Sequence, residues 1–109
     1  MIKIPEVTDE QWNQVNEFNR FIYDDFFANN IELSPKTIIA YKSNLKIWFR
    51  WVAENLDNKP QTEIRGLDYK RYQNWLISLE HSSSDISNKR AAISSLNNYI
   101  MVYYEREYP

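Results

Sequence analysis

A chain of 109 residues, 43% of them hydrophobic, has the size and material for one domain with a single core. It contains no cysteine, which excludes disulfides, thiolate metal sites and a cysteine nucleophile. The net charge is −2, but seven acids and two bases precede residue 34, whereas eleven bases and eight acids follow it. This asymmetry places the basic character of the chain after its first third.

Apolar residues recur every three or four positions in four segments, which predicts four helices. The first follows Thr8, a residue that favours helix capping, and the second opens at Ser34-Pro35, where serine caps and proline takes the first helical position. The fourth follows Ser84, which we expect to be its cap. The predicted helices span residues 9–29, 35–56, 67–80 and 85–105.

Short connections between helices of this length favour a compact four-helix bundle. The single glycine, Gly66, argues against a sheet with tight hairpins and against a glycine-rich phosphate-binding loop. The sequence therefore predicts an all-α fold in which residues 1–109 form one domain. No apolar run is long enough to cross a bilayer, so we expect a cytoplasmic protein without a membrane partner.

The second predicted helix has two chemically different sides. On a helical wheel four cations share an arc of about 120°, opposite a stripe of aromatic and aliphatic side chains. Small residues in the strip between them would let the backbone approach DNA while the cations bind phosphate. An ordinary amphipathic helix with a lysine-rich solvent face fits the spacing equally well. The cations are Lys36, Lys42, Lys46 and Arg50, and the small residues are Ala40, Ser43 and Asn44.

The fourth predicted helix repeats this pattern. Its side away from the core carries small polar residues and Arg90, as a helix in a major groove requires. A helix packed against a neighbouring domain would show the same small side chains. Lys89 falls inside the apolar arc, where its long stem would let the ammonium group reach outward. We expect the polar sides of the second and fourth helices to adjoin and to form one positive patch.

Residues suited to catalysis are scarce. His81 is the only histidine, and the adjacent Asp24 and Asp25 point about 100° apart on a helix, so they cannot form a facing pair. A tyrosine nucleophile would need converging arginines and a histidine, which the chain does not supply. We therefore predict no catalytic residue, no metal site and no cofactor, and we expect this chain by itself not to be an enzyme.

The run from Leu33 to Phe49 resembles the S-x-x-T-x-x-x-Y-x-x-x-L-x-x-F signature of the core-binding domain of tyrosine recombinases, the phage integrase family. The segment 64–76 is similar to the third-helix pattern of that domain, and residues 84–96 are similar to the opening of its fourth helix. The resemblance extends from about residue 18 to residue 108.

This resemblance implies a four-helix module of the core-binding, SAM-like type that forms one jaw of a clamp around duplex DNA at the crossover site. The implied partners are double-stranded DNA, other recombinase protomers and the catalytic domain of the same parent chain, which would follow residue 109. Strand cleavage and rejoining would belong to that absent domain. The implied location is a bacterial or phage-infected cell, at the nucleoid when DNA is bound.

The resemblance also implies which residues face DNA. The helical wheel agrees with it except at Thr37, which the wheel places beside the core stripe. A helical protein-interaction module without a DNA role is the alternative, favoured by the net charge of −2 and the acidic first helix. The predicted DNA-binding residues are Lys36, Thr37, Ala40, Lys42, Ser43, Asn44 and Lys46 on the second helix, and Ser84, Ser87, Lys89, Arg90 and Ser94 on the fourth.

Overall fold

A computed structural model describes residues 1–29 and 32–104 of the chain, and within these ranges it contains helices and no strand. The predicted all-α class is thereby confirmed. No helix in the described ranges combines the length and the apolar character needed to cross a membrane. The elements are α1 (Asp9–Asn13), α2 (Glu17–Asn29), α3 (Pro35–Asn55), the 3-10 turn η1 (Gln61–Glu63), α4 (Gly66–Ser78) and α5 (Ser83–Tyr104).

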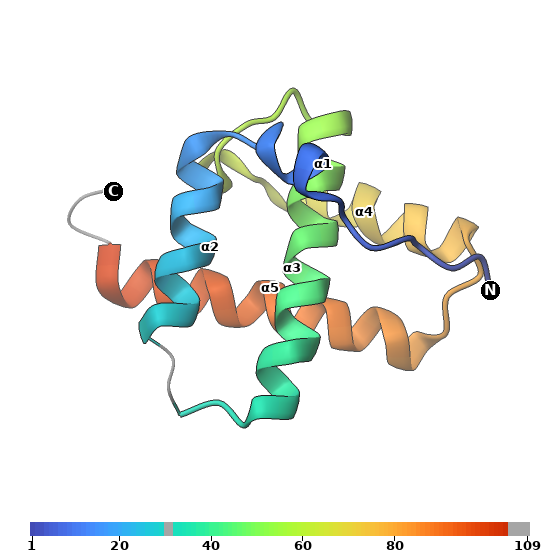
Figure 1. Cartoon of the computed structure of the whole chain (residues 1–109). Coiled ribbons are helices and arrows are strands. Elements are labelled where there is room, and N and C mark those ends of the chain that lie inside the picture. Colours follow the sequence, from blue (N-terminus) through green and yellow to red (C-terminus); the bar gives the residue numbers. More distant parts are fainter. Residues whose placement is uncertain (30–31, 105–109) are drawn as a thin grey trace.

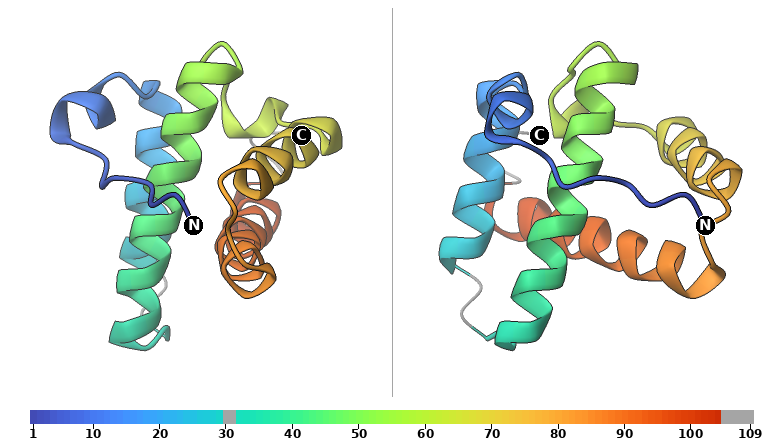
Figure 2. Two further views of the ribbon diagram at one scale, coloured as in Figure 1. Left: turned by 90° about the vertical axis from the view of Figure 1, so that its right-hand side faces the viewer. Right: turned by 45° about the vertical axis from the view of Figure 1, so that its right-hand side comes forward.

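The helices form two layers. Figure 2 shows α1, α2 and α3 on one side and α4 with α5 on the other. Helix α3 runs across α5 at a steep angle, and its first turns extend beyond the crossing (Figure 1). The most extensive packing between two helices is that between α3 and α5. This crossing therefore organises the fold.

The single first helix predicted over residues 9–29 is wrong, because the structure has two helices there, separated by residues 14–16. Val15 lies buried in this turn, and the side-chain oxygen of Asn16 accepts the backbone N–H of Asn19 at 2.7 Å, which caps α2. Asn58 holds the turn from a distant part of the chain. Its side-chain oxygen accepts the backbone N–H of Asn16 at 3.0 Å, and its carbonyl accepts the Asn16 amide at 2.8 Å.

The other helices begin and end within two residues of the predicted positions, although residue 105, the predicted end of the last, lies outside the described residues. The prediction that Ser84 caps the fourth helix is wrong. Helix α5 starts at Ser83, and the hydroxyl of Ser82 accepts the backbone N–H of Asp85 at 3.1 Å. The three consecutive serines offer equivalent caps, so local chemistry does not choose between them.

Helix α3 supplies the centre of the core. Leu45, Trp48, Phe49 and Val52 are each completely buried, as the predicted apolar stripe requires. The Trp48 ring stacks on Tyr69 of α4 with ring centroids 5.3 Å apart. Because α3 contacts helices of both layers, burial of its stripe joins the layers into one core.

A buried polar network links η1 to four helices. The side-chain oxygen of Gln61 accepts the Trp48 indole N–H at 2.9 Å. Its amide nitrogen donates to the Tyr69 hydroxyl and to the Asn97 side-chain oxygen, both at 3.0 Å. The backbone N–H of Gln61 donates to Asn19 of α2 at 2.8 Å. Gln61 is only 3% exposed, so its hydrogen bonds replace those lost to water.

We expect Tyr72→Phe to raise the free energy of unfolding by about 1 kcal/mol. The Tyr72 hydroxyl is buried and has no hydrogen-bond partner among the described residues, and burial raises its pKa. Tyr69→Phe is the matched control, because the Tyr69 hydroxyl accepts hydrogen bonds from Gln61 and Asn97. This control should lose about 1–3 kcal/mol in urea unfolding. Equal losses in the two variants would contradict the prediction.

The segment before α1 crosses the outer side of α3 (Figure 1). The backbone N–H of Ile2 donates to the Leu79 carbonyl at 2.9 Å, and the Ile2 carbonyl contacts Nε2 of His81 at 3.0 Å. The other ring nitrogen of His81 contacts the carboxylate of Asp85. His81 thus joins the amino-terminal segment to the start of α5, which is a structural role.

Candidate nucleic-acid interface

Two side-chain contacts hold the crossing of α3 and α5. The ammonium group of Lys89 donates to the side-chain oxygen of Asn44 at 3.2 Å, and the Ser95 hydroxyl donates to the Tyr41 hydroxyl at 3.4 Å. These four residues mark the edge along which the outer surfaces of the two helices meet. Helical spacing then tells which other side chains adjoin this edge.

Small side chains dominate the surface beside the crossing. On α5, Ser84, Asn88 and Ala91 are exposed and lie three or four residues apart, in one strip with Ser95. On α3, Thr37 and Ala40 lie on the strip of Tyr41 and Asn44, and Lys36 is exposed one residue earlier. We call this surface the α3/α5 junction; it consists of Lys36, Thr37, Ala40, Ser84, Asn88 and Ala91.

The sequence pattern did not identify Asn88 as a candidate. It placed the centre of the polar side of the fourth helix about 100° around the helix axis from Asn88. The position of Asn88 four residues after Ser84 and three before Ala91 was the available signal. Without knowledge of which side of α5 contacts α3, that signal could not be used. Ser87, a predicted residue, is exposed next to this strip and borders the junction.

The expectation that Lys89 reaches outward is wrong. Lys89 is 7% exposed, and its ammonium group lies between Asn44 and the carboxylate of Asp85, 3.4 Å from the latter. Burial raises the pKa of Asp85, but its hydrogen bond with His81 and the charge of Lys89 outweigh this effect and hold the pKa below its usual value. Lys89 and Asn44 thus serve the helix crossing, where an ion pair compensates for the buried charge.

Lys42 and Lys46 lie on the side of α3 that faces α1 and α2. The Lys46 ammonium group is 5.3 Å from the ring centroid of Trp12 and 5.7 Å from that of Tyr23, and Lys42 is 5.5 Å from the ring of Phe27. Such cation–π contacts contribute about 0.5–1 kcal/mol at exposed sites. Ser43 is exposed on the same side, where it lines a shallow groove with these two lysines.

The predicted single positive patch is divided in the structure. Arg50 forms an ion pair with Glu54 at 2.7 Å and lines a groove beneath the amino-terminal segment. Arg90 and Ser94 line a different groove, between α4 and α5. Of the predicted residues, Lys36, Thr37, Ala40 and Ser84 belong to the junction and Asn44 lies at the crossing, whereas Lys42, Lys46 and Arg90 lie on other surfaces. Within the described residues no cluster of His, Asp and Glu is arranged to hold a metal ion.

Comparison with known proteins finds similarity to a recombinase-like protein. The chain is 41% identical over 99 residues to the SPbeta prophage-derived recombinase-like protein YomM of Bacillus subtilis (strain 168). This chain is therefore related in sequence to part of a recombinase-like protein. The match covers 91% of the chain but 29% of YomM, so the chain spans less than a third of its relative's length. No family model and no solved structure matches the chain.

Proposed function

We propose that this chain is a DNA-binding module of a site-specific recombinase, of the core-binding, SAM-like type found in tyrosine recombinases. The α3/α5 junction is its DNA-binding surface, and duplex DNA at the crossover site is its ligand. The observation that carries this proposal is the junction itself. Two crossing helices present strips of small side chains on either side of their contacts, and no acid lies within the strips. Lys36 is exposed at the edge and forms no ion pair or hydrogen bond within residues 1–29 and 32–104.

The chemistry of the junction suits a major groove. An α-helix fits into that groove, and small side chains allow its backbone to come close to the base edges. Ser84, Asn88 and Thr37 offer hydrogen-bonding groups, and Ala40 and Ala91 offer methyl groups that can contact thymine. Lys36 is exposed at the end of α3 that extends beyond α5, where it can bind a phosphate.

Similarity to YomM, a recombinase-like protein, supports a role in DNA recombination or integration. Under this proposal the cleavage and rejoining of strands belong to a catalytic domain of the parent protein, and the chain described here positions that domain on DNA. Its further partners are other recombinase protomers on the same DNA, in the cytoplasm of a bacterial or phage-infected cell.

A salt titration tests the proposal. We expect the chain to bind a fluorescent duplex of about 30 base pairs with an affinity that falls steeply with salt, because bound phosphates release counterions. Lys36→Ala should weaken binding several-fold and reduce the slope of log K against log salt by about one. Lys46→Ala should have a smaller effect, because that ammonium group lies over Trp12 and Tyr23.

Two outcomes would count against this proposal. If the folded chain binds no duplex at low salt, DNA binding is wrong and the protein-interaction module becomes the better explanation. If Lys46→Ala weakens binding as much as Lys36→Ala, the cations facing α1 and α2 contact DNA and the junction is not the interface. Circular dichroism of each variant checks that the fold is retained.

A further inference from the structure

A groove of about 440 Å³ separates α4 from α5. Its polar lining comes from both helices, and no acid is among the described residues that form it. The floor is apolar and includes Leu76 and Ile93, which are buried. Polar side chains on the walls are Lys70, Gln73 and Asn74 of α4 and Arg90, Ser94 and Asn97 of α5.

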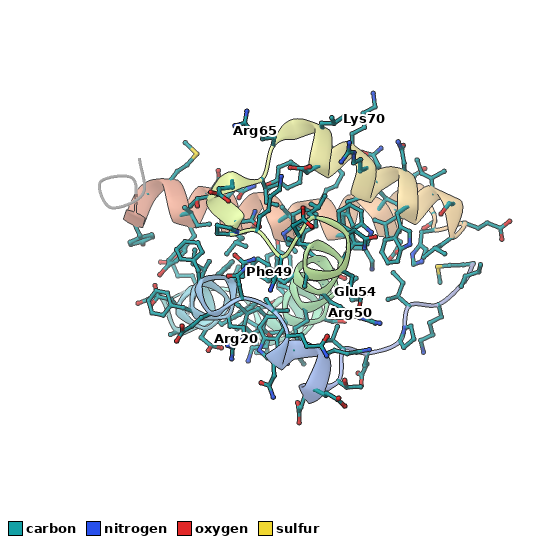
Figure 3. The ribbon with its side chains drawn as sticks, turned by 90° about the horizontal axis from the view of Figure 1, so that it is seen from above. Arg20, Phe49, Arg50, Glu54, Arg65 and Lys70 are labelled. Carbon is teal, nitrogen blue, oxygen red and sulfur yellow. The ribbon has the colours of Figure 1, made fainter. Side chains whose placement is uncertain are left out.

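The two cations of this groove are free to bind an anion. Lys70 and Arg90 are exposed, and neither takes part in an ion pair or hydrogen bond within the described part of the chain. By contrast, Lys59 pairs with Asp68 at 2.7 Å, and Arg50 pairs with Glu54. In Figure 3, Lys70 lies on α4 at one side of the molecule, and Arg20 of α2 and Arg50 of α3 lie at the opposite side. The groove therefore combines unpaired positive charge with hydrogen-bond donors.

The position of the groove relative to the junction indicates which anion it binds. A major groove is about 12 Å wide, and a helix with its side chains measures about 10–12 Å, so an inserted helix has a phosphate backbone along each flank. The strip of α5 that enters the major groove under the proposed function includes Ser95, which contacts Tyr41 of α3. Arg90 and Ser94 lie about 110° around the helix from this strip, on the flank that faces α4 across the groove.

We propose that the α4/α5 groove binds the phosphodiester backbone of DNA, with Lys70 and Arg90 as its phosphate contacts. This proposal rests on the proposed function, because it requires α5 to lie in the major groove. It assigns Arg90 to the backbone, whereas the sequence analysis placed this residue among the small polar side chains of the helix side suited to a major groove. It also gives α4 a part in DNA binding. An acidic peptide has similar chemistry, but the groove lies beside the strip of α5 that belongs to the junction.

A pair of variants on α4 tests the groove. Lys70→Ala and Arg71→Ala each remove one exposed cation from neighbouring positions, but only Lys70 lines the groove. We expect Lys70→Ala to weaken binding of a mixed-sequence duplex by about 3- to 10-fold near 0.1 M salt and to reduce the salt slope by about one. Arg71→Ala should change the affinity by less than about twofold. Arg90→Ala should behave like Lys70→Ala.

The outcomes separate this proposal from the one on which it rests. If the unmodified chain binds DNA with a steep salt dependence but Lys70→Ala and Arg71→Ala behave alike, the groove proposal is overturned and the junction remains the interface. If the unmodified chain binds no DNA, both proposals fail. Binding of poly-glutamate that depends on Lys70, without any binding of duplex DNA, would identify an acidic peptide as the ligand and overturn both.

Discussion

Ala40→Glu should lower the affinity of this chain for duplex DNA by on the order of 10- to 100-fold, because a like charge at a binding interface costs several kcal/mol and each 1.4 kcal/mol is about tenfold. Ala40 is exposed on α3 and belongs to the junction. In the proposed complex a carboxylate at this position faces the phosphates. It also lies four residues after Lys36, close enough to pair with that lysine and withdraw its charge from DNA.

Ala28→Glu is the matched control for this experiment. Ala28 is exposed on α2, on the side of that helix opposite the buried Ile22 and Phe26. Both substitutions add one negative charge to an exposed helical alanine, so a general effect of net charge would appear in both. Fluorescence anisotropy at fixed salt should show a large loss for Ala40→Glu and a small loss for Ala28→Glu. Equal losses would argue against the junction.

Gln61→Leu should lower the free energy of unfolding by about 2–4 kcal/mol, since it leaves several buried polar groups without partners. The indole N–H of Trp48, which is fully buried, loses its acceptor. The Tyr69 hydroxyl and the Asn97 side-chain oxygen each lose a donor. Leucine has nearly the volume of glutamine, so the effect reports lost hydrogen bonds more than a cavity.

Gln73→Leu serves as the control in the same urea unfolding experiment. Gln73 is half-buried on α4 and makes no side-chain hydrogen bond within the described residues. Its substitution should change the free energy of unfolding by less than about 0.5 kcal/mol. A Gln61→Leu variant as stable as the unmodified chain would show that the hydrogen bonds of the Gln61 side chain add nothing to stability.

Local chemistry made the helices predictable. Ser34 accepts the backbone N–H of Thr37 at 3.2 Å and Pro35 occupies the first helical position, as the sequence indicated. The apolar stripe of α3 could also be foreseen, because side chains three or four residues apart share a side of any helix. Hence the all-α class, the bounds of α3 and its buried stripe follow from residues that are neighbours in the sequence.

The neighbouring helix that each side chain faces could not be predicted from the sequence pattern. A helical wheel shows that Lys42, Lys46 and Lys36 share an arc, but it does not show that α1 and α2 cover part of this arc with aromatic rings. It likewise cannot show that Arg90 faces α4 while Ser95 faces α3. The predicted DNA-binding residues were therefore assigned to one surface, whereas the structure distributes them over several.

The sequence by itself determined which segments of this protein are helical and which sides of those helices are apolar, because both depend on spacing along the chain. The tertiary structure alone decided where the first helix breaks and which polar residues adjoin one another. The break after α1 depends on Asn58, which is 42 residues from Asn16, and the burial of Lys89 depends on Asn44, 45 residues away. Contacts between such distant residues form only when the helices pack, so no local pattern records them.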